Sequence, residues 1–233
     1  MIPRVKGTED LLDLHLYNAI LDLCTSHLRT HHFTPIQTPI LEHTSLFLRS
    51  LGQETDVVTK EMYTFTTKGG EEICLRPEAT ASTMRAFLEH RPEERPWRVF
   101  SHGSMFRHER PQKGRWREFS QLNMEVIGSS AISQDAYFIA LLDRLFSETL
   151  QLSDYVLKVN FLGTRADRDS YRAHLRTFID TIVDSLCETC KVRRNTNILR
   201  VLDCKNETCQ TLYRKAPKIT DSLGAESATR WRS

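Results

Sequence analysis

The sequence predicts an α+β fold in which an antiparallel sheet is flanked by helices. Two segments rich in aromatic and β-favouring residues, 97–106 and 119–127, lie on either side of a short charged turn, as expected for a β-hairpin. A stretch with apolar residues at helical spacing precedes them near the N-terminus. Because 39% of the 233 residues are hydrophobic, the chain is long and apolar enough for a packed core.

The N-terminal region is predicted to form a helix and then an edge strand. Apolar side chains recur at helical spacing in the first of these, at Leu14, Tyr17, Leu21, Cys24 and Leu28. Thr8 or Asp10 is the expected N-cap. Residues 32–42 contain Pro35 and Pro39, which lack a backbone donor. This segment therefore suits an edge or interface strand rather than a central one.

A second hairpin is predicted over residues 62–75, because Gly69 and Gly70 separate two short β-favouring runs. Pro77 should end the strand, and Thr80 is the expected cap of a helix that runs to His90. Glu78 lies where a helix macrodipole favours a negative charge, so a structural role at this helix start is one interpretation of this residue.

The turn between the strands 97–106 and 119–127 is strongly basic. It contains five cationic residues and two acidic ones. The cationic residues are Arg107, Arg110, Lys113, Arg115 and Arg117, and the acidic residues are Glu109 and Glu118. Guanidinium groups bind phosphate oxygens in pairs, so the turn suits a polyphosphate or a nucleic-acid backbone, with a solvated charged loop as the alternative. On the exit strand, period-two alternation predicts that Leu122, Met124 and Val126 face the core and that Phe119, Gln121 and Glu125 share the other face.

Helical elements are predicted to dominate the rest of the chain. A helix is expected over 133–150 with a cap at Ser133, followed by a strand over 155–161 and another helix within 164–186. Four cysteines, Cys187, Cys190, Cys204 and Cys209, have the spacing C-x2-C-x13-C-x4-C. This is close to the spacing of a zinc ribbon, but the second pair is looser, and a structural zinc site is not favoured on spacing alone.

Several stretches resemble the histidyl-tRNA synthetase family, a member of the class II aminoacyl-tRNA synthetases. Phe106-Arg107-His108-Glu109 before the basic turn and Arg117-Glu118-Phe119 after it are similar to the second class II motif. Residues 32–42 resemble the first motif, with Pro39 at its characteristic proline and His32 where a glycine is usual. Lys6-Gly7-Thr8 and Arg76-Pro77-Glu78 resemble two further segments of the family, with Ala79 in place of its glycine.

The resemblance implies a histidine–tRNA ligase, which uses ATP to activate histidine as the adenylate and then transfers it to tRNA(His). Arg107 would be the catalytic residue, in contact with the α-phosphate and the histidine carboxylate. The family's ATP-binding residues correspond to Arg107, Glu109, Arg115 and Phe119. Its histidine-binding residues correspond to Glu78, Ala79, Thr80, Arg107, Gln121 and Glu125. Mg2+ would bridge the phosphates, and the segment around Pro39 would form a homodimer interface.

The resemblance also implies a domain organisation. Residues 1–163 would form a class II catalytic core with motifs 1 and 2. Residues 164–233 would form a helical continuation and the start of the family's insertion region. The glycine-rich third motif and the anticodon-binding domain of the family have no counterpart in the sequence. The core is therefore expected to be incomplete at its C-terminal side, and the chain alone to have little or no activity.

Two other classes of function fit part of the sequence. A non-catalytic paralogue, such as the regulatory subunit of ATP phosphoribosyltransferase, shares the implied fold, but Arg107, Arg115, Gln121 and Glu125 favour the ligase. An RNA-binding module would explain the basic turn but not Gln121 and Glu125. The sequence has no apolar run of membrane-spanning length and no secretory signal, so a cytoplasmic protein without a membrane partner is predicted.

Overall fold

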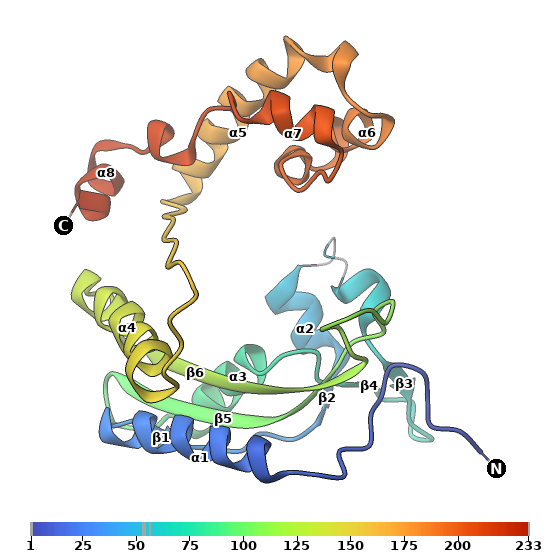
Figure 1. The fold of residues 1–233 in the computed structure, drawn as a ribbon, viewed down its shortest axis with the longest axis vertical. Helices are drawn as coiled ribbons and strands as arrows, with labels where there is room; N and C mark the ends of the chain where they lie inside the picture. The colour runs from blue at the N-terminus through green and yellow to red at the C-terminus, as the bar shows by residue number, and fades with distance from the viewer. Residues whose placement is uncertain (1, 53–54, 56, 233) are drawn as a thin grey trace. The chain divides into compact units, whose positions relative to one another are not determined.

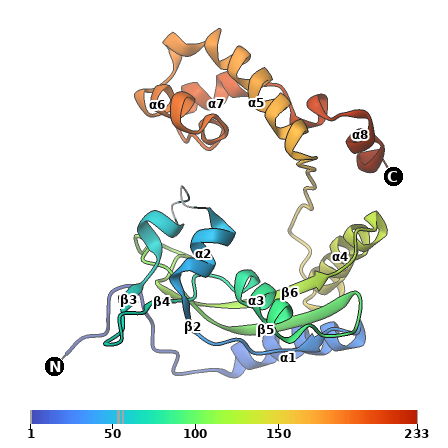
Figure 2. The same cartoon turned by 180° about the vertical axis from the view of Figure 1, so that it is seen from behind.

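The computed structural model describes residues 2–52, 55 and 57–232 and divides the chain into two compact units. Unit 1 extends to Asp154 and unit 2 begins at Tyr155, earlier than the division predicted after residue 163. Unit 1 combines helices with two sheets, which confirms the predicted α+β class, and unit 2 consists of helices and loops in the part described (Figures 1 and 2). Within the described ranges, no helix is both long and apolar enough to cross a membrane.

Unit 1 is built on two three-stranded sheets. Their strand orders are β1-β5-β6 and β2-β4-β3. The strands are β1 (Thr34–Pro35), β2 (Leu41–His43), β3 (Thr64–Thr66), β4 (Glu72–Leu75), β5 (Trp97–Phe106) and β6 (Glu118–Ile127). The helices are α1 (His15–Thr30), α2 (Thr44–Leu51), α3 (Thr80–His90) and α4 (Ile132–Arg144), with the π-helical turns η1 (Val57–Glu61) and η2 (Leu145–Thr149). Both predicted hairpins are present, and β5 has the predicted bounds.

The predicted edge strand over 32–42 is divided between the two sheets. β1 lies at an edge, parallel to β5, whereas β2 pairs antiparallel with β4. Pro39 lies between them and outside both strands. The segment thus links the sheets, because its two ends pair with different strands.

One face of the β5–β6 hairpin carries the main core of unit 1. Leu28 of α1, Phe33, Phe100 of β5 and Leu141 of α4 are buried together. The β6 residues that pack against this cluster are Leu122, Met124 and Val126. The period-two prediction for β6 is therefore confirmed, and α1 and α4 cover this face (Figure 1).

His32, which stands where the resembling family usually has glycine, lies just after the end of α1. His32 adopts the left-handed conformation with φ of 62°. Its N–H donates to Arg29 O at 3.0 Å, and the N–H of Phe33 donates to Leu28 O at 3.0 Å. These two bonds and the burial of Leu28 with Phe33 form a Schellman cap. The turn is therefore kept by hydrogen bonds and packing, at the cost of a strained non-glycine residue.

The predicted caps of α1 and α4 and one predicted strand are wrong. α1 begins at His15, whose N–H donates to Asp13 Oδ1 at 2.9 Å, so neither Thr8 nor Asp10 is the cap. α4 begins after Ala131, with Ser133 inside the helix, and ends at Arg144 before η2. The predicted strand over 155–161 pairs with no other strand among the described residues. Alternating side chains alone do not make a strand, because the backbone needs a hydrogen-bonding partner.

Unit 2 is a small helical unit. Its elements are α5 (Arg165–Asp180), η3 (Val183–Ser185), α6 (Glu188–Thr196), η4 (Ile198–Val201), α7 (Glu207–Tyr213), η5 (Ile219–Ser222) and α8 (Ala225–Arg232). A capping box starts α5, in which the side chains of Thr164 and Asp167 each accept the other's backbone N–H. The apolar side of α5, with Leu175 and Ile179 fully buried, packs against a core that includes three cysteines.

Candidate functional site

The antiparallel register of β5 and β6 determines which side chains share the face opposite α1 and α4. Gln121 pairs with Gly103, Phe119 with Met105, and Glu125 with Val99. Phe119, Gln121 and Glu125 are all partly buried on this face. The structure thus places these three predicted site residues along one side of one strand, at alternate positions.

Arg107 lies at the point where β5 enters the basic turn. Its N–H donates to Arg117 O at 2.9 Å, which closes the turn, and its Nε donates to Pro77 O at 2.9 Å. Its guanidinium carbon lies 5.3 Å from the centroid of the Phe119 ring, a cation–π contact. Arg107 is therefore fixed at the end of the Phe119 face by two chain segments, with its guanidinium group beside an aromatic ring.

Glu109 pairs with two arginines of the turn. Arg115 Nη1 lies 3.1 Å from Glu109 Oε2, and Arg107 Nη1 lies 4.0 Å from Glu109 Oε1. The side chain of Glu109 is only 15% exposed, whereas that of Arg115 is 59% exposed. A mostly buried carboxylate thus holds two guanidinium groups close to each other, where an anion with several oxygens can bind both.

The N-terminal segment packs directly on this turn. Arg117 N–H donates to Gly7 O at 2.7 Å. Gly7 has φ of +89°, and a Cβ there would lie 2.9–3.0 Å from side-chain carbons of Arg117 and Pro111. Only glycine fits this position without strain, so the Lys6-Gly7-Thr8 segment has a structural function in holding the turn.

Arg76 is a residue of the site region for which the sequence suggested no role. It is 4% exposed, and its Nη1 donates to Thr38 O at 2.9 Å while its Nε donates to Ser104 O at 3.1 Å. Its Nη2 lies 2.7 Å from the place that a Cβ on Gly103 would take. Burial lowers the pKa of the Arg76 guanidinium. The signal in the sequence was a glycine inside a strand, which marks a close approach by another group.

The segment after Arg76 departs from the sequence prediction. Glu78 Oε2 accepts the N–H of Thr80 at 2.6 Å, and Glu78 Oε1 accepts the N–H of Ala81 at 2.9 Å. Glu78 therefore satisfies the free donors at the start of α3, and the prediction that Thr80 is the cap is wrong. Ala79 is fully buried and Thr80 is exposed. Of the two interpretations of Glu78, the structure shows the helix-start contact.

Two side chains on the Phe119 face have unused hydrogen-bonding capacity. Gln121 Oε1 is buried and has no hydrogen-bond partner in the described part of the chain. Glu125 Oε1 accepts a hydrogen bond from Asn123 Nδ2 at 3.3 Å. A buried acceptor without a donor costs free energy, and a bound ligand that carries N–H groups would remove that cost.

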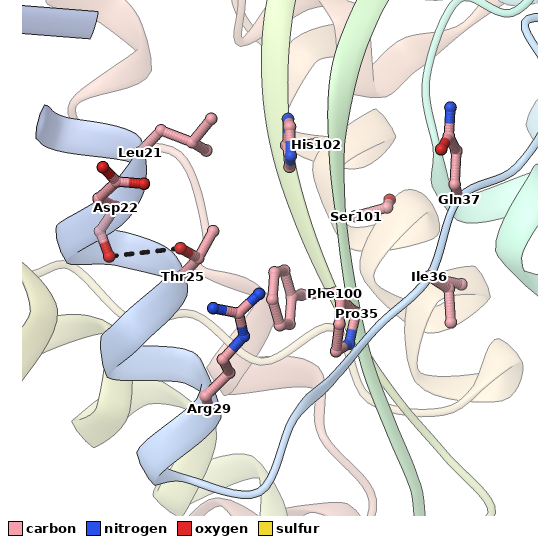
Figure 3. Close-up of a pocket in the computed structure, with 10 residues that line it drawn as sticks. All are labelled: Leu21, Asp22, Thr25, Arg29, Pro35, Ile36, Gln37, Phe100, Ser101 and His102. Carbon is pink, nitrogen blue, oxygen red and sulfur yellow. Dashed lines mark hydrogen bonds between the residues drawn. The ribbon is translucent and has the colours of Figure 1, made fainter. Parts of the chain in front are cut away.

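A cavity of about 500 Å3 lies away from this face, beside α1 (Figure 3). Residues of α1, including Asp22 and Arg29, line one side, and residues 35–37 with the β5 residues Phe100 to His102 line the other. It contains none of the predicted site residues. It opens next to β1, at the edge of the sheet.

The four C-terminal cysteines meet in space. Their Sγ atoms all lie within 4.8 Å of one another, and Cys190, Cys204 and Cys209 are buried. A hydrogen bond from the Cys190 backbone lowers the pKa of the Cys187 thiol to about 7, whereas burial raises the pKa of Cys190 to about 12. Cys204 and Cys209 thus lie in the same four-sulfur group as Cys187 and Cys190, although their spacing in the sequence is wider.

The family model and the curated relatives at more than 40% identity belong to one family. The family model described as histidyl-tRNA synthetase matches residues 10–166. A histidine–tRNA ligase of Campylobacter concisus is 44% identical over 231 residues, which cover 97% of this chain and 56% of the relative. One from Thermosipho melanesiensis is 45% identical over 227 residues, 96% of this chain and 54% of the relative. The chain thus spans about half the length of the curated relatives it matches.

Solved structures show the same fold. The apo histidyl-tRNA synthetase of S. aureus superposes with a TM-score of 0.69 at 29% identity, over 100% of this chain and 53% of that one. A Bacillus halodurans protein described as an ATP phosphoribosyltransferase regulatory subunit/histidyl-tRNA synthetase superposes with a TM-score of 0.63 at 18% identity, over 99% of this chain and 66% of that one. The second likeness concerns the fold alone.

Proposed function

Because the chain belongs to the histidyl-tRNA synthetase family, we propose that it provides the motif 1 and motif 2 part of a histidine–tRNA ligase. The reaction would be attack of a histidine carboxylate oxygen on the α-phosphorus of ATP, with pyrophosphate leaving, followed by transfer of histidine to tRNA(His). The observation that carries the proposal is Arg107, held against Phe119 at the end of a strand face that continues through Gln121 and Glu125. Such a protein would work in the cytoplasm, where translation takes place.

In this proposal the nucleotide lies at the turn end of the face. The adenine would stack on Phe119, and Glu109 would accept its amino group. Arg107 would contact the α-phosphate, and Arg115 the outer phosphates. Mg2+ bound to ATP would neutralise part of the phosphate charge. Arg107 is suited to its role because its Nε is already bonded to Pro77 O, so its terminal N–H groups are oriented before a substrate arrives.

Histidine would lie farther along the same face. The unpartnered Gln121 Oε1 and the Glu125 carboxylate supply acceptors for the N–H groups of an ammonium or imidazole. Ala79 and Thr80 would line the pocket. Glu78, whose oxygens each accept one backbone N–H, would keep a lone pair on each for the ammonium group. The two substrates would thus bind side by side on this face, with Arg107 in contact with the α-phosphate and the histidine carboxylate.

The proposal is tested by measuring histidine binding and nucleotide binding separately in variants of the β5–β6 hairpin. Glu125→Ala should weaken histidine binding by at least tenfold and leave ATP binding unchanged, because the lost carboxylate faces only the amino acid. Arg107→Ala should weaken binding of an adenylate analogue by roughly 10- to 100-fold, the value of a charge-assisted hydrogen bond. Isothermal calorimetry measures both.

Two controls on the same hairpin keep the result interpretable. Glu118→Ala removes an exposed carboxylate from the opposite face of β6, and Arg110→Ala removes an exposed arginine of the turn. Both should bind as the unchanged chain does. Histidine affinity unaltered by Glu125→Ala, or lowered equally by Glu118→Ala, would refute the assignment of this face.

The regulatory paralogue remains a rival that the same measurements distinguish. A regulatory subunit does not need a nucleotide and histidine side by side, whereas a ligase does. We expect the 233-residue chain to bind both, but to catalyse histidine-dependent ATP–pyrophosphate exchange at least about a hundredfold more slowly than a full-length relative, since a missing preorganised cation costs that much. Exchange as fast as that of the relative would show that the site needs no third motif.

We also propose a homodimer through the edge formed by α1, β1 and the Pro39 segment. Apolar side chains are exposed along it, including Leu16 at 73%, Leu23 at 48% and Leu41 at 54%. The unpaired side of β1 and the cavity of Figure 3 lie at the same edge. Sedimentation should show a dimer that Leu23→Asp weakens, and a monomer at all concentrations would refute this interface.

A further inference from the structure

We propose that Cys187, Cys190, Cys204 and Cys209 form a structural zinc site in unit 2. This inference is independent of the β5–β6 face and of the ligase reaction. It rests on the positions of four sulfur atoms, on the backbone that orients them and on the size of the unit that they hold together.

The sulfur positions are close to those of a zinc tetrathiolate. Four sulfurs at about 2.3 Å from a zinc ion lie about 3.8 Å from one another. The Sγ atoms of Cys187 and Cys204 are 3.7 Å apart, and all four lie within 4.8 Å of one another. Closing the group around an ion thus requires movements of about 1 Å or less, which side-chain rotation supplies.

Two separate arms carry the ligands. Cys187 caps the N-terminus of α6 and Cys190 lies in its first turn. Cys204 follows η4, and Cys209 lies in α7. The second arm is braced by Asn206, whose side chain accepts the N–H of Cys209 at 3.2 Å, and by Gln210, whose amide donates to Cys204 O at 3.2 Å. The looser spacing of the second pair is therefore compensated by side-chain hydrogen bonds.

Donors surround the sulfurs, as a site for thiolates requires. The backbone N–H of Cys187 donates to Cys209 Sγ at 3.4 Å, and that of Asn206 donates to Cys204 Sγ at 3.4 Å. The hydroxyl of Tyr213 is buried beside Cys190. Such outer contacts stabilise metal-bound ligands, and a thiolate at Cys190 would accept a hydrogen bond from the Tyr213 hydroxyl.

Burial and size both favour a closed structural site over a catalytic one. Three of the four cysteines are buried, and four thiolates fill all four positions of a tetrahedral zinc, so none is left for a water or a substrate. The cysteines form part of the only buried apolar cluster described for unit 2. A unit of fewer than 80 residues rarely gains enough stability from one small core, and a metal is a common supplement.

Two other uses of the four cysteines are less compatible with the geometry. Disulfides join sulfurs in pairs, whereas here each arm directs both of its sulfurs to one shared centre. An iron–sulfur cluster needs space for its inorganic atoms between the cysteines, and sulfurs this close together leave room for a single ion.

The experiment is elemental analysis of the whole chain, purified without chelator. We expect about one zinc per chain, and less than about a tenth of that after Cys187→Ser with Cys190→Ser. Cys24→Ser with Cys74→Ser is the matched control, because it removes two buried cysteines from unit 1, and it should keep the zinc. Replacing zinc by Co2+ should give the absorption spectrum of tetrahedral thiolate cobalt.

The outcomes that overturn the proposal are distinct. They are a folded chain without metal, disulfides among the four cysteines after aerobic purification, iron in place of zinc, or zinc retained by the double variant. Since the double variant is expected to lose the fold of unit 2, the metal content and cobalt spectrum of the unchanged chain decide the question without it. One zinc with a tetrathiolate spectrum supports the site.

Discussion

The β5–β6 hairpin of unit 1 and the cysteine cluster of unit 2 are built in opposite ways. In the hairpin, ten residue pairs along the strands fix which face each side chain occupies. Its charged groups already have partners, such as Glu109 with Arg115 and Arg107 with Pro77 O. In the cluster, four sulfurs lie close together inside an apolar core, and two of them accept hydrogen bonds from backbone N–H groups.

The two sites differ in whether their residues are positioned before a ligand binds. A ladder of backbone hydrogen bonds positions the hairpin residues before any ligand binds, so substrates would add affinity but little order. The cluster has no strand to hold it in the part of unit 2 that is described, and its ligand would be a component of the core. The two units should therefore respond differently to the same perturbation.

The largest expected effect is that of removing metal. A chelator should unfold unit 2 and leave unit 1 intact, because binding of a structural zinc supplies roughly 10 kcal/mol of folding free energy in small domains. Hydrogen exchange measures this: amides in α5, α6 and α7 should lose protection by orders of magnitude, while those of β5 and β6 keep theirs. Equal loss of amide protection in both units, or no loss in either, would contradict the proposal that zinc stabilises unit 2 alone.

The next effect concerns Gly103 in unit 1. Gly103→Ala should lower the unfolding free energy by about 2–4 kcal/mol, because the backbone has φ of +151° and the new Cβ would lie 2.7 Å from Arg76 Nη2. Arg76 is held by Thr38 O and Ser104 O, so it has little freedom to move away.

Urea unfolding followed by fluorescence measures this change. Gly69→Ala is the control, since the nearest atom would be 3.7 Å away and its φ is not positive. It should change stability by less than about 1 kcal/mol. A tolerated Gly103→Ala would mean that Arg76 does not constrain the strand.

A pH-dependent effect is expected in unit 2. Hydrogen bonds from Ser227, Gly224 and Thr164 hold the pKa of Asp167 well below its usual range. The ionised form thus stabilises the folded state at pH values above the unfolded pKa of about 3.9, and this stability is lost as the pH falls toward the folded pKa. The melting temperature of unit 2 should decrease below about pH 4.

Asp167→Asn should lower that melting temperature at neutral pH and remove the part of its acid dependence that comes from Asp167, while acid release of zinc from the cysteines would remain. Asp169→Asn, two positions along the same helix, removes an exposed carboxylate that pairs with Arg172 and should leave the acid transition in place. Scanning calorimetry between about pH 2 and 7 tests this. The same acid transition in both variants would show that Asp167 is not its source.

The smallest expected effect is at His32 in unit 1. His32→Gly should raise the unfolding free energy by about 0.5–1 kcal/mol, because glycine adopts the φ of 62° without strain. His32→Ala removes the imidazole but keeps a Cβ, so it should give no gain. Stabilisation by both substitutions would attribute the effect to the histidine side chain and not to the backbone.

Local patterns were sufficient for much of unit 1. The bounds of β5, the two hairpins and the core face of β6 follow from side-chain period and turn residues, because each depends on segments that follow one another in the sequence. The set of residues on the Phe119 face follows from the same alternation. The spacing of the four cysteines identified them as a group without showing whether they meet.

Contacts between distant segments decided the rest. Residues 155–161 have no strand partner in the described part of the chain, and Arg76 packs on Gly103 while it donates to Thr38 O and Ser104 O. The start of α3 was decided locally instead, since Glu78 rather than Thr80 accepts backbone N–H groups there. The four sulfurs converge because α6 and α7 pack in one core. Each of these outcomes depends on which backbone groups and side chains are brought together by folding, and a hydrogen bond or a clash depends on distances in space that sequence spacing does not set.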